Sequence, residues 1–169
     1  MTMTEMLVTE FDHEAQTTRK LLERLPADKL EWRPHEKSFT AGGLASHIVD
    51  CIGWADPILN QDELDVDPAK LQFFSATSVA DLLKTFDEKA NNCRAALART
   101  TNDELMKTWR LKIRGKVQVE KPRVAALRDF TLSHLIHHRG QFSNYLRLLD
   151  IPVPGSYGPS ADEARPGSM

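Results

Sequence analysis

The sequence has few cysteines, no long apolar run and no block of like charges. Its two cysteines, Cys51 and Cys93, have no paired spacing, which argues against a disulfide framework and predicts reduced, buried thiols. No stretch approaches the roughly 18 apolar residues of a membrane span. The first residues carry acids instead of a basic segment ahead of an apolar run, so we expect a cytoplasmic protein that contacts no membrane.

The charge balance gives no sign of a nucleic-acid partner. Lysine and arginine together number 22 against 24 acids, and neither sign gathers in one segment. With 169 residues, 41 % of them hydrophobic, the chain has the size and apolar content of one compact domain over residues 1–169. Turn-forming residues dominate from about 150 onward, where an extended tail is expected.

Apolar residues recur at helical spacing in four segments, which predicts an all-α fold. Pro26 ends the first segment, either Ser38 or Thr40 caps the second, and Pro57 weakens the last turn of the second. The connections between segments are too long for a simple up-and-down bundle, so at least one crossover is expected. The predicted helices span residues 3–25, 41–59, 78–99 and 123–149.

A short β-hairpin is expected between the third and fourth helices. Apolar and polar residues alternate from Trp109 to Ile113 and again from Val117 to Val119, across Arg114 and Gly115. The basic residues of this region form either a solvated face or a contact for an anionic ligand. They are Lys112, Arg114, Lys116, Lys121 and Arg123.

The fourth predicted helix contains the stretch LSHLIHHRGQF, with three histidines. His134 and His138 lie about 40° apart on one helix face, which also carries apolar side chains and turns inward. An unsatisfied buried polar group costs about 1–3 kcal/mol, and one metal ion satisfies both imidazoles. His137 lies off this face, where it serves as a flank or surface residue or contacts a substrate.

A transition metal needs at least a third protein ligand, and the second predicted helix offers His47. His47 lies on the apolar stripe of that helix, where a lone histidine is otherwise a hydrogen-bonded core residue. Cys51, one turn later, is a competing ligand because thiolate suits zinc. Asp50 is either an acceptor that orients an imidazole or a surface residue.

The remaining polar residues near these motifs have weaker assignments. His13 has mostly polar neighbours and His35 stands in a loop after a proline, so both are poor ligands, although His13 stays a candidate pocket residue. Arg139 and Gln141 flank the inward face of the fourth helix, where they either orient the site or bond to neighbouring helices.

Two segments resemble the DinB-like (DinB/YfiT) metal-binding proteins: LEWRPHEKSFTAGGLASHIVD and HLIHHRGQFSNYLRLLDIPVPGSYGPSADE. The resemblance implies a four-helix bundle with up-down-down-up connectivity. It also implies a divalent metal ion, zinc or nickel, bound by His47, His134 and His138 with one position open for water or substrate.

Some relatives resemble thiol transferases or isomerases that use bacillithiol or mycothiol. The first functional hypothesis is therefore a metal-dependent transferase or hydrolase-like enzyme that activates a thiol or water and takes a small-molecule substrate. The second is a non-catalytic, metal-stabilised protein that binds a partner under stress, with a homodimer allowed. No catalytic side chain is assigned beyond the metal ligands.

Overall fold

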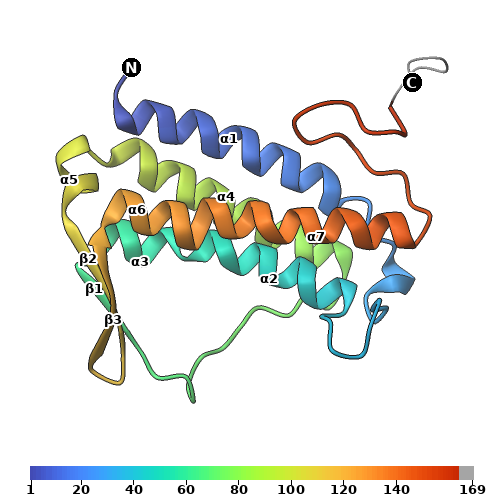
Figure 1. Ribbon diagram of the computed structural model, residues 1–169, viewed down its shortest axis with the longest axis horizontal. Coiled ribbons are helices and arrows are strands. Elements are labelled where there is room, and N and C mark those ends of the chain that lie inside the picture. Colours follow the sequence, from blue (N-terminus) through green and yellow to red (C-terminus); the bar gives the residue numbers. More distant parts are fainter. Residues whose placement is uncertain (164–169) are drawn as a thin grey trace.

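The computed structural model describes residues 1–163 and is mostly helical, with a small three-stranded sheet. In Figure 1 the long helical segments lie side by side and the sheet packs at one end of them. The elements in chain order are α1 (Met3–Leu22), η1 (Ala27–Lys29), α2 (Ala41–Gly53), α3 (Ala55–Asn60), β1 (Glu63–Val66), α4 (Val79–Arg99), α5 (Asn102–Met106), β2 (Thr108–Ile113), β3 (Lys116–Pro122), α6 (Arg123–Leu127), η2 (Arg128–Ser133) and α7 (His134–Leu148).

Hydroxyl side chains cap the first turns of three long helices, α1, α2 and α4. The Thr40 hydroxyl accepts a hydrogen bond from the Gly43 amide, so Thr40, and not Ser38, is the cap of α2. Ser78 caps α4 in the same way, and Thr2 with Glu5 forms a capping box at α1. Each cap satisfies backbone amides that have no partner inside the helix.

Two predicted helices are interrupted, and the first is shorter than expected. The second breaks between Gly53 and Ala55 because Pro57 has no N–H to donate to the Gly53 carbonyl. The fourth is three consecutive pieces, in which the π turn η2 separates α6 from α7. The first helix ends at Leu22, after which the Arg24 and Leu25 amides bond to carbonyls three residues back and the chain reaches Pro26.

The predicted hairpin is confirmed as β2 and β3, joined through Arg114 and Gly115, which both have positive φ (49° and 76°). The all-α prediction missed β1, which pairs in parallel with β2. Acidic side chains form ion pairs with four of the five basic residues of the hairpin region. The structure therefore does not support the second predicted role of these residues, contact with an anionic ligand. The pairs are Lys112–Glu63, Arg114–Asp67, Lys121–Asp129 and Arg123–Asp62.

A long connection follows β1 and runs along the molecule to the start of α4 (Figure 1). Two of its backbone amides are tied to α2: that of Phe74 donates to Asp50 Oδ2 (3.0 Å) and that of Ala76 to Ser46 Oγ (3.0 Å). The connection therefore forms a wall beside α2. Among residues 1–163, no helix combines the length and apolar character that crossing a membrane requires.

The tail contains no helix or strand from Ile151 to Glu163, and it is fastened to the helices by side chains. The Tyr157 hydroxyl lies 3.0 Å from both Glu14 carboxylate oxygens, and Asp162 pairs with Arg147. The last part of the predicted tail, 164–169, lies outside the described residues.

Arg123 gives a direct test of this packing. Its side chain is 4 % exposed, and its guanidinium donates to the Ile58 and Leu59 carbonyls (2.8 Å each) at the end of α3. Arg123→Met leaves these carbonyls without a partner, so we expect the free energy of unfolding to fall by about 2–4 kcal/mol in urea denaturation. Arg110→Met, which breaks an exposed pair with Glu120, is the control and should cost less than about 1 kcal/mol. Equal losses would contradict the assignment.

Candidate metal centre

Three histidines from two helices meet where α2 packs against α7. The ring centroid of His47 lies 5.0 Å from that of His134 and 4.5 Å from that of His138. The centroids of His134 and His138, one turn apart on α7, are separated by 4.7 Å. The fold thus brings together the three residues that the sequence singled out as ligands.

The closest approach is between Nε2 of His47 and Nε2 of His134, at 3.3 Å. Two nitrogens at this distance either share a proton or bind one cation. In a tetrahedral zinc site with Zn–N bonds of about 2.0–2.1 Å, two ligand nitrogens lie about 3.3–3.4 Å apart. The observed separation therefore fits a shared metal ion without rearrangement of α2 or α7.

The chain also orients the imidazoles of α7. Nδ1 of His138 lies 2.8 Å from Gln141 Oε1, a contact in which the ring donates and its Nε2 lone pair stays free. The backbone of Phe130, in the π turn, raises the pKa of His134, but by less than burial lowers it. Burial, the largest cause, lowers the pKa of both histidines below the ordinary value of 6.5. Both rings are therefore neutral at pH 7 and able to bind a cation.

The π turn changes one part of the predicted geometry. In an uninterrupted α-helix Leu127 and His134, seven residues apart, would lie in one row, but the extra residue of a π turn rotates the face that follows by about 100°. Leu127 is fully buried, whereas His134 is half-buried. His134 and His138 keep their shared face because both belong to α7.

Cys51 is a second way to complete the donor set. One donor atom from each of His47, Cys51 and His134 lies within 4.8 Å of the others, so this group could hold a metal ion. Cys51 is fully buried, and burial, reinforced by the charge of Asp50, raises the pKa of its thiol to about 12. His138 lies on the accessible side instead, since it is partly exposed.

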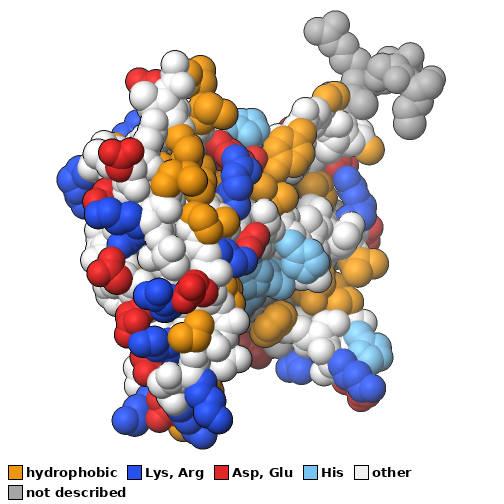
Figure 2. Space-filling view, turned by 60° about the vertical axis from the view of Figure 1, so that its left-hand side comes forward, with side chains coloured by type: hydrophobic (Ala, Val, Ile, Leu, Met, Phe, Trp, Pro, Cys, Tyr) orange, Lys and Arg blue, Asp and Glu red, His pale blue; other side chains and the backbone are white. Residues whose placement is uncertain are grey.

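The cluster is open to solvent on one side. His47, His134 and His138 are each half-buried, while the neighbouring residues Ile48 and Leu135 are fully buried. Figure 2 shows histidine side chains reaching the surface in the middle of the face it draws, with hydrophobic and charged side chains around them. A small molecule can therefore reach the imidazoles without unfolding a helix.

Asp50 has neither of its two predicted roles. Its Oδ1 accepts from Lys89 Nζ (2.8 Å), and its Oδ2 accepts from the Phe74 amide. It is mostly buried and orients no imidazole; its carboxylate ties α2 to α4 and to the long connection.

Arg139 bonds to a neighbouring helix, which is one of its two predicted roles. It is buried and forms an ion pair with Glu14 of α1, and it also donates to the Tyr157 hydroxyl (2.7 Å). Gln141 has the other role, because it orients His138. His137 is exposed, with its ring 4.8 Å from that of His138, as expected for a residue off the inward face.

The two weak candidates lie apart from the cluster. His13 is exposed and stacks on Tyr157, with ring centroids 5.9 Å apart. His35 lies in the loop before α2, where its Nδ1 accepts from the Lys37 amide (3.1 Å). Both rings make contacts with other parts of the chain and contribute nothing to the three-histidine cluster.

The sequence reasoning missed three phenylalanines beside the cluster. Phe39 stacks on His47, with centroids 5.5 Å apart and planes 18° apart. Phe39, Phe73 and Phe74 line a cavity that also contains His47. The sequence feature that could have indicated them is the pair Phe73–Phe74, which lies in a segment without helical spacing. Two adjacent aromatic residues outside a helix have no helix face with which to pack into the core.

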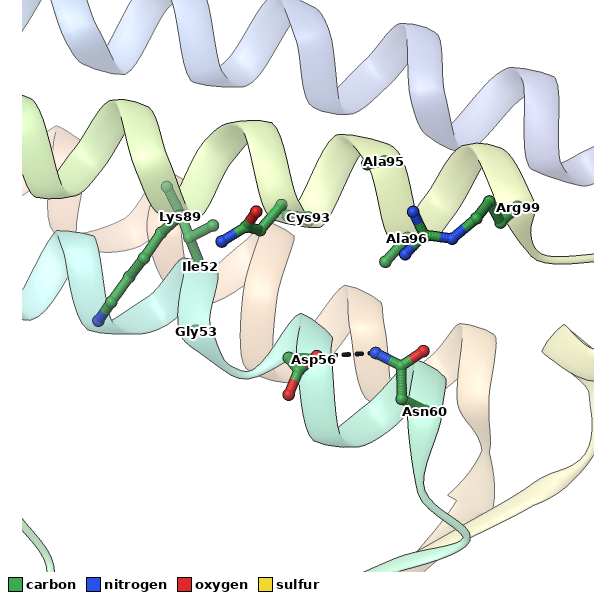
Figure 3. A pocket seen from close by; sticks show the side chains of 10 residues that line it. Ile52, Gly53, Asp56, Asn60, Lys89, Cys93, Ala95, Ala96 and Arg99 are labelled. Carbon is green, nitrogen blue, oxygen red and sulfur yellow. Dashed lines mark hydrogen bonds between the residues drawn. The ribbon is translucent and has the colours of Figure 1, made fainter.

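A separate cavity of about 380 Å³ lies between α4 and the segment formed by the end of α2 and α3 (Figure 3). It is lined by polar side chains, among them Asp56, Lys89 and Arg99, and by the Cys93 thiol. Burial raises the pKa of Cys93 to about 12, so this thiol stays protonated. None of the three clustered histidines lines this cavity, which makes it a poorer candidate for the reactive site.

Comparisons with known proteins agree with this fold. The chain is 28% identical over 153 residues to the uncharacterized protein YrdA of Bacillus subtilis (strain 168), covering 90% of this chain and 87% of YrdA. A DinB-like protein from Bacillus cereus ATCC 10987 has a similar structure, with a TM-score of 0.70 and 21% identity over 88% of this chain and 94% of that one.

A second solved structure, the DinB-like protein YjoA from Bacillus subtilis, matches with a TM-score of 0.66 and 23% identity, covering 87% of this chain and 95% of that one. At these sequence identities the two solved structures support the fold alone. The model of the DinB family matches residues 1–167. With nearly the whole length matched, this chain belongs to the DinB family.

Proposed function

We propose that this chain is a metal-dependent transferase that joins a low-molecular-weight thiol to a small electrophile. His47, His134 and His138 hold the metal ion, zinc or nickel. The observation that carries the proposal is the approach of the His47 and His134 Nε2 atoms to 3.3 Å on a face that is open to solvent. The three imidazoles would hold a divalent ion there, and such an ion would lower the pKa of a bound thiol so that a thiolate is available near neutral pH.

The chain's own residues prepare this site. Gln141 holds the His138 ring through the contact of its Oε1 with Nδ1. The rings of His134 and His138 lie one turn apart on α7, with centroids separated by 4.7 Å. Hydrophobic side chains, among them Phe39 and Phe74, lie beside His47 and lower the local polarity on that side of the site, which strengthens electrostatic interactions there.

The reaction needs no nucleophile from the protein. The thiolate sulfur attacks the electrophilic carbon, a new S–C bond forms, and the leaving group departs with the electron pair of its own bond. The thiol proton goes to solvent. With a chlorinated aromatic the products are a thioether, chloride and a proton, so atoms and charges balance.

The buried Cys51 favours a second function, a non-catalytic protein stabilised by a closed metal site. In that case His47, Cys51 and His134 hold the ion and tie α2 to α7. Because Cys51 is fully buried, an ion held by this donor set would lie on the inner side of the histidines, away from a substrate thiol. The metal then contributes to folding, and the surface around it binds a partner or a second copy of the chain.

We also propose the up-down-down-up arrangement of the family for the long helices, and a small molecule, with no nucleic acid, as the partner. The long connection supports the first proposal, since it allows α2 and α4 to run in the same direction (Figure 1). Cavities of about 310 and 410 Å³ beside the histidines support the second, because small-molecule sites typically measure about 300–1,000 Å³.

Elemental analysis of protein purified without added metal tests the ligands. We expect about one divalent ion per chain in the wild type and a loss of most of it in His134→Ala, because two ligands bind weakly. His137→Ala is the matched control from the same helix and should keep its metal. Metal retained in His134→Ala would contradict the site.

Cys51→Ser separates the two functions in the same measurement. An open three-histidine site keeps its metal when the thiol is removed. A closed site with Cys51 as a ligand loses most of it. The variant changes one buried atom, and a urea denaturation curve of the same sample checks that it is folded.

Turnover is tested with the metal-loaded protein, 1-chloro-2,4-dinitrobenzene and a panel of low-molecular-weight thiols, by following the absorbance of the thioether. We expect the wild-type rate to exceed that of His138→Ala by at least about 100-fold, since the variant loses a ligand. His137→Ala should keep the wild-type rate. Equal rates for wild type and His138→Ala with every thiol would count against the enzyme.

A further inference from the structure

Two cavities flank the three histidines, and Phe39 lines both of them. The first, of about 310 Å³, is bounded by α2 and the long connection, and its walls are mostly aromatic. The second, of about 410 Å³, is bounded by α7 and the loop before α2, and its walls are mostly polar. His47 faces the first cavity and His138 faces the second.

The apolar cavity has prearranged walls. On α2 it is lined by Gly43, His47 and Asp50, which lie at helical spacing on one face. Opposite them, Phe73 and Phe74 come from the long connection, and the bond from the Phe74 amide to Asp50 holds that segment in place. The walls therefore exist before any ligand enters.

The one acid in this cavity is already neutralised. Lys89 Nζ lies 2.8 Å from Asp50 Oδ1 and also stands 5.7 Å from the centre of the Phe74 ring. Both carboxylate oxygens of Asp50 are occupied. A ligand in this cavity thus meets aromatic rings and no uncompensated charge, which suits an apolar group.

Two aromatic side chains at the cavity are exposed to an unusual degree. Phe39 is 53% exposed and Phe73 is 65% exposed. Large apolar side chains gathered at the surface beside a pocket are typical of a binding site, because a ligand removes them from water. Aromatic rings gain further from stacking on another ring, as Phe39 already does on His47.

The polar cavity has the opposite character. Lys37, Gln141 and Asn144 line it together with His138. Lys37 forms no ion pair with any carboxylate of residues 1–163. Its positive charge can therefore attract an anionic, hydrophilic molecule. Phe39 separates this cavity from the apolar one, and the Tyr145 hydroxyl fixes its position by donating a hydrogen bond to the Phe39 carbonyl (3.2 Å).

We propose that the cavity lined by Phe39, Phe73 and Phe74 binds the apolar aromatic part of the electrophile, with its reactive carbon beside His47, while the hydrophilic thiol enters from the side of His138. This inference rests on the proposed transferase function and adds a substrate class to it. The protein then selects aromatic or similarly flat, uncharged electrophiles, and the two reactants approach from opposite sides of Phe39.

The test measures binding of 1,3-dinitrobenzene, which has the shape of an aromatic electrophile and no leaving group. It is titrated into the full-length, metal-loaded protein and followed by NMR. We expect Phe73→Ala to weaken binding by about three- to tenfold, the effect of removing one aromatic contact. The exposed position of Phe73 makes this variant safe for folding.

Leu148→Ala is the matched control, because Leu148 is 63% exposed and lines the polar cavity. Its affinity for dinitrobenzene should stay within twofold of the wild type. No binding to the wild type, or equal weakening in both variants, overturns the assignment of the apolar cavity.

The binding readout also separates the two proposals. If dinitrobenzene binds and Phe73→Ala weakens it, but no thiol gives turnover, the apolar cavity stands and the transferase function is wrong. If turnover occurs and Phe73→Ala leaves dinitrobenzene affinity unchanged, the function stands and the cavity assignment is wrong.

Discussion

The candidate metal centre depends on one contact, the approach of α2 to α7 that leaves two imidazole nitrogens 3.3 Å apart. Fully buried apolar side chains on both helices, such as Ile48 and Leu135, set the distance between the helix axes. Nitrogens that close cannot both point lone pairs at each other without a proton or a cation between them. The apolar packing thus places the two imidazoles at a separation that requires a shared proton or suits a bound cation.

Besides a metal centre, a reaction needs a pocket for the substrate, and the long connection between β1 and α4 forms one wall of such a pocket. Phe73 and Phe74 belong to this connection, and the Asp50 carboxylate holds their segment against α2 by accepting a hydrogen bond from the Phe74 amide. Asp50 is compensated by Lys89 from α4, so three parts of the chain meet at one carboxylate. This arrangement places aromatic rings beside His47 while keeping net charge away from them.

Much of the fold was predictable, because caps and apolar stripes identify a long helix from neighbouring residues alone. The His134-x3-His138 pair and His47 were predictable for the same reason, since both lie on helices of known period. The four-residue strand β1 was missed because its ladder partner is distant in sequence. The π turn was missed because apolar spacing alone does not reveal an inserted residue.

The side chains that shape the pocket were harder to predict. In the sequence, Arg123 is one of several basic residues of the hairpin region. Only the fold shows that it donates hydrogen bonds to the carbonyls at the end of α3. Phe73 and Phe74 lie in a segment whose path is set by two backbone bonds to α2. Such contacts between distant segments have no periodic signature, so sequence patterns give the candidate ligands but not the walls around them.

The central claim is that three imidazoles, and no thiolate, hold the metal ion. X-ray absorption at the metal edge of the purified wild-type protein measures this directly, because nitrogen and sulfur ligands scatter at different distances. The account predicts a nitrogen or oxygen shell at about 2.0–2.1 Å with imidazole scattering and no sulfur. A sulfur shell at about 2.3 Å would place Cys51 in the site and contradict it.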